Sequence, residues 1–293
     1  MIDVLLPYYG DSPHFRLAVE SVIGQTTPDW RLICVEDASP RGDASAWLSS
    51  IDDDRIIHHR NALNLGVAGN FSRSLKLVES PYFQMMGSDD IMLPTHLEAV
   101  RDVSSRYPSA AMVQPGVRVI DGEGKSCHPL ADVVKSVLRP HEGDADLVLS
   151  GEALAASLAR ADWAYFPSIL WRTGAVLPIG FNAKYEIALD LGLMLDLALA
   201  GSAMVVSSPT TFEYRRHRAS VSMTSARSGV RFDQEKEFFL DYATRFENAG
   251  WSKAARIARR HVVSRLNALT EIPHAVLSRD GSGVSRLLRH VVT

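Results

Sequence analysis

The sequence has few of the features that mark secreted or membrane-spanning proteins. It holds two cysteines in 293 residues, Cys34 and Cys127, which is too few for a disulfide scaffold or a zinc site. The chain begins with no basic segment ahead of an apolar run, so we expect no signal peptide. The most apolar stretch, 191–206, contains Asp196, whose insertion into a bilayer would cost about 2.5–3.5 kcal/mol. We therefore expect a globular, cytoplasmic protein.

Several well-known catalytic and phosphate-binding motifs are also missing. No Gly-x-Gly-x-x-Gly, His-Glu-x-x-His or nucleophile-elbow sequence occurs. The segment 122–126 (Gly-Glu-Gly-Lys-Ser) lacks the earlier glycine that a phosphate-binding loop requires, because Val119 stands in that place. These absences disfavour dinucleotide oxidoreductases, metalloproteases and α/β-hydrolases.

Neither sign of charge dominates the whole chain, but the two signs are unevenly distributed. The 31 Lys and Arg against 34 Asp and Glu give a net charge of −3, which offers no reason to expect a nucleic-acid partner. Residues 251–293 nevertheless carry eight basic and two acidic side chains, a net charge of +6. This basic tail also has apolar residues near helical spacing, namely Trp251, Ala254, Ile257, Ala258, Val262 and Leu266.

Two interpretations of the basic tail remain open. It could form an interfacial helix that contacts the inner face of an anionic membrane, as apolar residues interleaved with arginines do. It could equally pack on the acidic body of the protein, with its arginines paired to acidic side chains.

The first hundred residues alternate short apolar runs with helical periodicity, as βαβ units do. Helices are expected over 13–25 and 67–78, and strands at Val4–Leu6, Arg31–Glu36, Arg55–His58 and Tyr82–Met86. Three of these strands end in polar or Gly/Pro-containing clusters, at residues 7–11, 37–40 and 87–90. Because ligands of parallel α/β sheets bind beyond the carboxyl ends of the strands, we expect the three clusters to form one site.

The rest of the chain is less regular. Helices are expected over 95–107, 151–161 and 189–200, and again from Arg231 onward. Strands are expected over 111–120, 166–172, 204–207 and 212–215, and the region 123–150 is expected to be irregular.

The segment Ser88-Asp89-Asp90 follows an apolar strand directly. Two adjacent carboxylates repel each other unless a cation lies near them, and hard divalent ions with phosphate-bearing substrates are a common solution. The same three residues could instead cap the N-terminus of a helix. Taken alone, the segment favours neither interpretation.

Five segments, at residues 4–9, 21–26, 34–39, 64–68 and 88–90, occur in an order and spacing that resemble the family 2 glycosyltransferases. A sixth, Phe212–His217 followed by Ser220–Ser222, resembles the late Tyr-Arg-x-His-x-x-Ser-x-Ser segment of that family. The resemblance implies an α/β fold of the GT-A type, with a Rossmann-like mixed sheet flanked by helices. This domain would cover 1–225, with a donor half over about 1–100 and an acceptor half over 101–225. A helical, basic extension over 226–293 would follow.

The resemblance also implies roles for individual residues. Those expected to bind the donor nucleotide are Pro7, Tyr8, Tyr9, Asp11, Asp37, Asn70 and Asp89. Those expected to hold Mn²⁺ or Mg²⁺ on the diphosphate are Asp89, Asp90 and His217. Asp190 would be the general base. The sequence departs from the family pattern at Glu36, which replaces an aspartate, at Phe71, where many members carry arginine, and at Leu189, which replaces a glutamate.

The activity implied by the resemblance is inverting, metal-dependent transfer of one sugar from a nucleotide-diphosphate sugar, with UDP as the expected nucleotide. The acceptor would be a hydroxyl of a glycan, a lipid-linked molecule or a small molecule. The Gln-x-x-Arg-Trp segment of processive synthases is missing, which favours single-sugar transfer. Two alternatives are a non-catalytic nucleotide-sugar-binding scaffold and a nucleotidyltransferase. The second would need a Gly-rich basic loop after the first strand, which residues 7–10 (Pro-Tyr-Tyr-Gly) do not supply.

Overall fold

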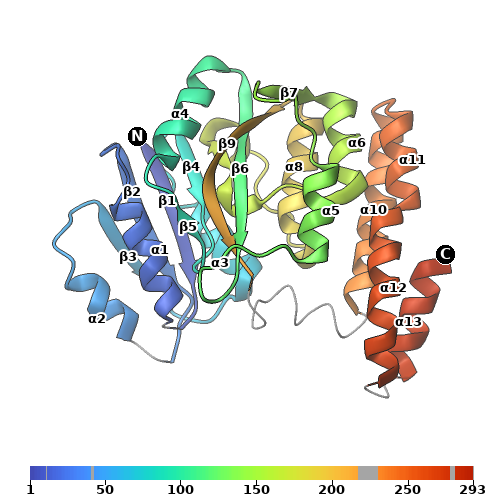
Figure 1. The fold of residues 1–293 in the computed structure, drawn as a ribbon, viewed down its shortest axis with the longest axis horizontal. Coiled ribbons are helices and arrows are strands. Elements are labelled where there is room, and N and C mark those ends of the chain that lie inside the picture. Colours follow the sequence, from blue (N-terminus) through green and yellow to red (C-terminus); the bar gives the residue numbers. More distant parts are fainter. Residues whose placement is uncertain (11, 41–42, 217–229, 278–280, 293) are drawn as a thin grey trace.

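A mixed nine-stranded β-sheet forms the centre of the protein in a computed structural model that describes residues 1–10, 12–40, 43–216, 230–277 and 281–292 (Figure 1). Its main path runs β3-β2-β1-β4-β8-β6-β9-β5, and β7 pairs with β9 beside that path. Four parallel strands make one half: β1 (Ile2–Tyr8), β2 (Trp30–Glu36), β3 (Ile56–Arg60) and β4 (Tyr82–Met85).

The other half of the sheet is built around β6 (Ala110–Ile120) and β9 (Ala203–Arg215), which run parallel to each other. The short strand β8 (Leu170–Arg172) lies antiparallel between β4 and β6 and joins the two halves. Two further strands, β5 (Ile91–Met92) and β7 (Leu147–Ser150), pair antiparallel with β9. This mixed sheet confirms the predicted α/β fold class.

Helices cover both faces of the sheet because the strands are apolar on both sides. Val4 and Leu6 of β1 pack on the same side as α1 (Pro13–Ile23), α2 (Asp43–Ser49) and α4 (His96–Arg106), whereas Leu5 packs on the other side. On that other side lie α3 (Gly66–Leu75), α6 (Gly151–Ala161), α8 (Leu189–Leu199), α10 (Val230–Asn248) and α11 (Ser252–Arg260). The remaining helices are α5 (Leu130–Leu138), α7 (Thr173–Val176), α12 (Val262–Leu277), α13 (Gly281–Val292) and two 3₁₀ turns, Phe166–Ser168 and Glu186–Ala188.

The structure differs from the sequence-based expectations where non-local pairing decides the conformation. The region 123–150 is not irregular throughout, because it contains α5 and also β7, which exists only through its pairing with β9. The predicted strand over 166–172 is a strand only from Leu170 onward. The strands predicted over 204–207 and 212–215 are parts of one strand, β9, whose register with β6 shifts beside Gln114 and Gly116.

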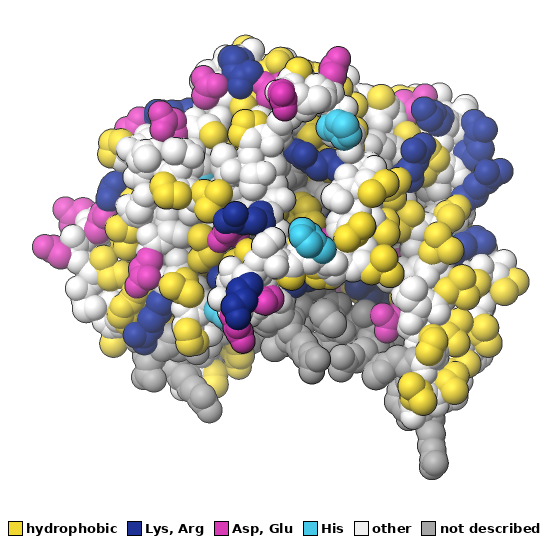
Figure 2. Space-filling model, in the orientation of Figure 1, with side chains coloured by type: hydrophobic (Ala, Val, Ile, Leu, Met, Phe, Trp, Pro, Cys, Tyr) yellow, Lys and Arg dark blue, Asp and Glu magenta, His cyan; other side chains and the backbone are white. Residues whose placement is uncertain are grey.

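The C-terminal helices are not all separate from the sheet domain. Phe238, Tyr242 and Phe246 of α10 belong to the same apolar core as α6 and α8. By contrast, α12 and α13 pack on each other around a second, smaller cluster that includes Phe232 from the start of α10. Its other buried members are Ala268, Ala275 and Leu287. Figure 2 shows apolar side chains exposed over these last two helices. The predicted domain boundary near residue 225 lies outside the described residues.

Among the described residues, no helix is both long and apolar enough to cross a bilayer.

A buried carboxylate at the amino end of the sheet ties β1, β2 and the start of β4 together. Asp3 is fully buried and accepts hydrogen bonds from Arg31 Nε and Nη2 (both 2.9 Å), from the backbone N–H groups of Glu79 and Ser80, and from Ser80 Oγ. Burial opposes ionisation, but these donors outweigh it and hold the pKa of Asp3 below its usual range.

We expect Asp3→Asn to lower the free energy of unfolding by about 3–5 kcal/mol at pH 7, because it leaves Arg31 without its buried partner. Since the folded-state pKa lies below the unfolded value of about 3.9, this stabilisation is complete above that pH and is lost as the pH falls toward the folded pKa. Urea unfolding at pH 7 and pH 3 measures both effects. Glu79→Gln removes the exposed partner of the same Arg31 and should cost less than about 1 kcal/mol. Equal losses in the two variants would contradict this account.

Candidate functional site

The three polar clusters predicted to meet do lie along one edge of the sheet. β2, β1 and β4 are adjacent parallel strands, so their carboxyl ends point the same way. The backbone N–H of Asp37 donates to the carbonyl of Tyr8 (2.9 Å), and the N–H of Met86 donates to the carbonyl of Leu5 (2.9 Å). The segments after β1, β2 and β4 therefore leave the sheet side by side, as expected for a ligand site.

Asp37 is fixed by the segment that joins β3 to α3. Its Oδ1 accepts from Asn61 Nδ2 (3.0 Å) and from the backbone N–H of Leu65 (2.8 Å). The next residue, Gly66, has a φ of +69°, which residues with a side chain rarely adopt, so the turn that contains the Leu65 N–H requires glycine. The segment 64–66 that contributed to the family resemblance thus has a structural task in positioning Asp37.

Asn70, predicted to bind the nucleotide, lies behind Asp37. It is buried, its Oδ1 accepts from Asn61 Nδ2 (2.9 Å), and its Nδ2 donates to the carbonyl of Val35 (3.1 Å). With both ends of the amide engaged, Asn70 holds Asn61, which in turn holds Asp37. Asn70 therefore helps to position Asp37, and its predicted contact with the nucleotide stays a prediction.

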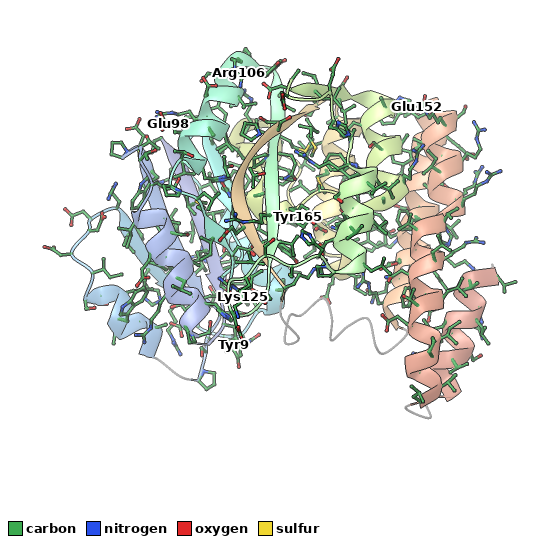
Figure 3. All side chains as sticks on the ribbon, viewed as in Figure 1. Tyr9, Glu98, Arg106, Lys125, Glu152 and Tyr165 are labelled. Atoms are coloured by element: carbon green, nitrogen blue, oxygen red, sulfur yellow. The ribbon has the colours of Figure 1, made fainter. Side chains whose placement is uncertain are left out.

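The residues predicted to line the base and ribose pocket differ in exposure. Pro7 is buried in β1, and Tyr8 is buried against Phe15 with a ring-centroid separation of 4.2 Å. The Tyr8 hydroxyl lies 3.0 Å from His58 Nε2. Tyr9, in contrast, is 60% exposed at the carboxyl end of β1 (Figure 3). Of these three side chains, Tyr9 is the one that a ligand arriving from solvent can reach.

Glu36, which replaces the family aspartate, also points into a protein network. Its carboxylate is ion-paired with Arg60 and lies 3.3 Å from His58 Nε2.

The two acidic residues after β4 occupy different environments. Asp89 is partly exposed, whereas Asp90 is 1% exposed and accepts a hydrogen bond from the Arg215 backbone N–H through Oδ1 (2.9 Å). The Asp90 Oδ2 atom is buried without a hydrogen-bond partner among the described residues. Burial and the nearby Asp89 charge raise the pKa of Asp90 well above its usual value. A Cβ at Gly87 would come within 2.4 Å of Asp90 Oδ2, so the glycine leaves room for this carboxylate.

Arg215 joins this acidic loop to the second half of the sheet. It ends β9 and is 4% exposed. Its Nε donates to the carbonyl of Asp89 (2.7 Å) and its Nη1 to the carbonyl of Asp121 (2.9 Å), while its backbone N–H donates to Asp90. One residue thus connects the loops that follow β4 and β6.

The next residue, Arg216, organises the opposite wall of the site. Its guanidinium makes two hydrogen bonds to the buried Asp132 of α5, from Nε (2.8 Å) and Nη2 (3.0 Å). The Tyr165 hydroxyl also donates to Asp132 (3.0 Å), and the Tyr165 ring packs against that of Tyr214 with a centroid separation of 5.1 Å. The ends of β9 and α5 are therefore locked together.

Asp190, the predicted general base, is partly buried in the first turn of α8 and accepts from the Leu191 N–H (2.8 Å). Burial, followed by the negative charge of Asp162, raises its pKa to about 6, while Lys135 and the Leu191 N–H act in the opposite direction. Asp162 ends α6 in a left-handed conformation (φ 31°), with Oδ2 3.8 Å from Lys135 Nζ.

The glutamate that often precedes this base in the family has no direct replacement here. Leu189 is 6% exposed and packs in the apolar interior. The carboxylate whose negative charge acts on Asp190 is that of Asp162, at the end of α6.

The donor set after β4 fits a divalent cation. Two adjacent carboxylates, one with a buried oxygen that lacks a donor, provide oxygen ligands of the kind that Mg²⁺ and Mn²⁺ prefer. Among the described residues, no three His, Cys, Asp or Glu side chains group to hold a metal ion. The predicted metal ligand His217 and Asp11, predicted to lie near the ribose or base, are both outside the described residues.

Some side chains of this site were not predicted. Arg215 and Arg216 lie inside the segment 212–217 that contributed to the family resemblance. Two adjacent arginines at the end of a strand are a sequence signal that could have indicated a role in the site. Asp132, Tyr165 and Asp162 carry no such local signal, because their positions depend on how α5 and α6 pack against β9 and α8.

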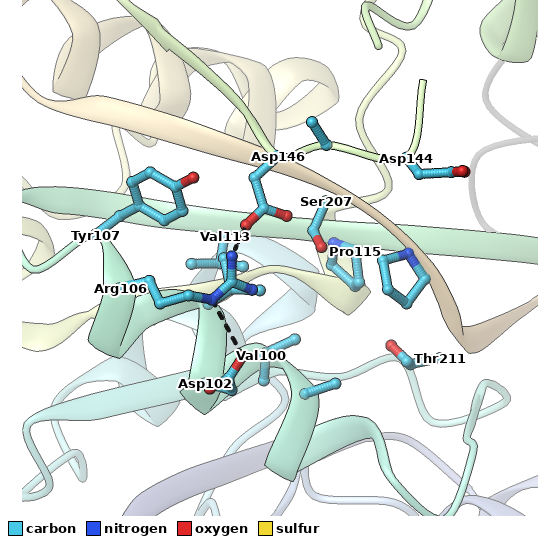
Figure 4. Close-up of a pocket in the computed structure, with 14 residues that line it drawn as sticks. Val100, Asp102, Arg106, Tyr107, Val113, Pro115, Asp144, Asp146, Ser207 and Thr211 are labelled. Carbon is cyan, nitrogen blue, oxygen red and sulfur yellow. Dashed lines mark hydrogen bonds and ion pairs between the residues drawn. The ribbon is translucent and has the colours of Figure 1, made fainter. Parts of the chain in front are cut away.

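A hollow of about 400 Å³ lies elsewhere, between α4, β6 and β9 (Figure 4). Arg106 crosses it to pair with Asp102 and Asp146. Figure 3 shows Arg106 at the opposite end of the sheet from Tyr9, and none of the predicted site residues lines this hollow.

Comparison with known proteins agrees with the geometry. The family model described as "Glycosyl transferase family 2" matches residues 3–162, more than half of the chain. The chain belongs to glycosyl transferase family 2. This matched region contains β1 to α6, including Asp37, Asp89 and Asp90.

Several similar proteins are longer than this chain. An uncharacterized glycosyltransferase of Rickettsia felis is 24% identical over 129 residues, which are 43% of this chain and 21% of that protein. The chain thus spans about a fifth of the length of this relative. The succinoglycan biosynthesis protein ExoW of Rhizobium meliloti is 25% identical over 214 residues, 70% of this chain and 66% of that protein.

Solved structures show the same fold. Residues 1–349 of S. aureus TarS in complex with UDP-GlcNAc match with a TM-score of 0.63 at 12% identity, covering 99% of this chain and 90% of that chain. The match confirms the GT-A type of fold.

We expect Arg215→Met to lower the free energy of unfolding by about 2–4 kcal/mol, because it leaves two carbonyls without a donor and removes positive charge beside Asp90. Thermal and urea unfolding measure the loss. Arg118→Met is the matched control, since Arg118 is half exposed and pairs with Glu213 of the same strand β9. It should cost less than about 1 kcal/mol. A comparable loss in the control would argue against the bridging role of Arg215.

Proposed function

We propose that this family 2 protein is an inverting, non-processive, metal-dependent glycosyltransferase. It moves one sugar from a nucleotide-diphosphate sugar to a hydroxyl of a glycan, lipid-linked or small-molecule acceptor. The observation that carries the proposal is a continuous set of contacts. The contacts run from Asp89 and Asp90 through Arg215 and Arg216 to Asp132 of α5. Lys135, also on α5, pairs with Asp162, and the charge of Asp162 acts on Asp190.

The donor nucleotide is proposed to bind at the edge formed by β1, β2 and β4. Tyr9 is exposed there for contact with the base or ribose, and Asp37 is held in place to accept from the base edge. TarS, which shares the fold, was solved with UDP-GlcNAc and with UDP, which supports UDP as the nucleotide here.

Asp89 and Asp90 are proposed to hold Mn²⁺ or Mg²⁺ at the donor diphosphate, with His217 as a further predicted ligand. Asp89 is partly exposed and is the member of the pair that faces solvent, whereas Asp90 lies behind it. The cation would offset the negative charge that develops on the diphosphate as it leaves.

Asp190 is proposed to accept the proton of the acceptor hydroxyl. The hydroxyl oxygen then bonds to the anomeric carbon from the face opposite the diphosphate, the bond from that carbon to the diphosphate breaks, and the configuration inverts. A carboxylate with a pKa of about 6 is a stronger base than an ordinary aspartate, yet it is still mostly ionised at pH 7.

Donor binding can be tested without knowing the acceptor. We expect UDP with Mn²⁺ to raise the melting temperature of the wild-type protein by more than UDP alone, because the proposed cation would contribute to UDP binding. A ligand at 100 times its Kd raises the free energy of unfolding by about 2.7 kcal/mol. Asp89→Asn should lose the Mn²⁺-dependent part of the shift. Asp102→Asn, an exposed change on α4, should keep it. No shift with UDP, UDP-GlcNAc or other nucleotide diphosphates would count against the proposal.

Transfer itself is tested by Asp190→Asn. We expect the rate of UDP release from UDP-sugars with hydroxyl acceptors to fall about 10²–10⁴-fold while UDP binding is retained. In the wild type, kcat/KM should fall tenfold per pH unit below about pH 6, because protonated Asp190 cannot accept a proton. A protein that binds UDP but transfers no sugar from any donor to any acceptor would instead be a scaffold.

The neighbouring carboxylate provides a sharper test of the same base. Asp162→Asn removes a like charge and releases Lys135 from its ion pair, so the acid limb of the kcat/KM profile should move to lower pH. Asp144→Asn, an exposed change far from α8, should leave the limb in place. An unchanged limb in Asp162→Asn would mean that Asp190 does not set it.

A further inference from the structure

The helix α12 exposes its apolar side. Six residues recur at spacings of three and four along it and form what we call the α12 stripe: Val262, Leu266, Leu269, Pro273, Val276 and Leu277. Five of them are 44–83% exposed, and Pro273 is exposed as well. An amphipathic helix normally turns such a stripe toward the core. Here the small residues Ala268 and Ala275 face inward instead, so the stripe is without a partner among the described residues.

The helix before it, α11, has the opposite arrangement. Its Ala254, Ala255 and Ala258 are buried against the body, and its basic side chains face solvent. Lys253, Arg256 and Arg260 are exposed and make no ion pair with the residues that the structure describes. Figure 2 shows the basic side chains over α11 adjoining the apolar ones over α12 and α13. The apolar face of α11 is therefore closed to a membrane, and the exposed apolar side chains lie on the next helix.

We infer that the α12 stripe lies on an anionic membrane surface, with the basic side chains of α11 against the lipid head groups. Apolar side chains that enter the head-group boundary beside a row of Lys and Arg are what an interfacial helix requires. The net charge of +6 over 251–293 complements anionic lipid. A second copy seated on the same stripe by two-fold symmetry would bring two such basic segments together, which their repulsion opposes.

The outer side of α5 extends this contact toward the site. Leu130, Val133, Val134 and Val137 are 37–76% exposed, and Figure 2 shows apolar side chains over α5 on the same face as those over α12. The inner side of α5 carries Asp132 and Lys135, which belong to the wall around Asp190. If the proposed function holds, this contact keeps the acceptor side of the site at the lipid surface, where a lipid-linked acceptor would lie.

Vesicle co-sedimentation tests the inference without donor or acceptor, so its outcome is independent of sugar transfer. The probes are vesicles of phosphatidylcholine alone and of phosphatidylcholine with 30% phosphatidylglycerol, a composition of about one anionic lipid in three. We expect wild-type protein to bind the anionic vesicles. The triple variant Leu266→Ser, Leu269→Ser, Val276→Ser should reduce the partition coefficient at least about tenfold.

A matched control replaces three apolar residues elsewhere that are 44–47% exposed, Leu17→Ser, Val148→Ser and Leu177→Ser, and should bind as the wild type does. Lys253→Gln, Arg256→Gln and Arg260→Gln together should abolish the preference for anionic vesicles. Thermal unfolding and UDP binding check that each variant is folded.

Three results would overturn the inference. One is wild-type protein that stays in the supernatant with both vesicles, and another is stripe-variant binding equal to that of the wild type. The third is a wild-type dimer in vesicle-free solution that the stripe substitutions convert to a monomer, which would assign the stripe to a second copy.

Discussion

The arrangement of the site depends on one buried arginine at the junction of the two halves of the sheet. Arg215 closes β9 and binds the backbone of the loops that follow β4 and β6, while its own N–H holds Asp90. An arginine can do this because its guanidinium carries several donors in a fixed plane and keeps its charge when buried. Its position in turn requires that β9 pair with both β6 and β5, so the mixed half of the sheet orients the acidic loop of the parallel half.

Charge is concentrated along this edge, and the fold compensates for it. Asp132 faces Arg216, Asp162 faces Lys135, and Asp37 accepts from an amide and a backbone N–H. The exceptions are informative, since Asp90 and Asp162 each retain a buried oxygen without a hydrogen-bond partner among the described residues. Buried oxygens that lack donors cost free energy, and a cation bound as we propose would offset that cost at Asp90.

The C-terminal helices divide between two kinds of packing. α10 and α11 contribute aromatic and alanine side chains to the core that α6 and α8 share, so the sheet domain is built in part from the tail of the chain. α12 and α13 form a separate small cluster with Phe232 of α10 and leave apolar surface outside it. From its basic composition alone, the tail could either contact a membrane or pack on the body of the protein. Among the described residues of the tail, α11 packs on the body of the protein, whereas α12 and α13 expose apolar side chains.

The sequence by itself determined the alternation of strands and helices, the edge at which the polar clusters meet, and the family to which they belong. These features are local, because strand runs, helical periods and the residues after each strand are read from neighbours along the chain. It also indicated Asp37, Asp89, Asp90 and Asp190, whose functional roles, like those of Asp11 and His217, remain predictions. Only the tertiary structure decided that Asp90 lies behind Asp89, that Asn70 supports Asp37, and that Asp162 accompanies Asp190. Burial and the distance between helices are set by packing between distant segments, which no local pattern records.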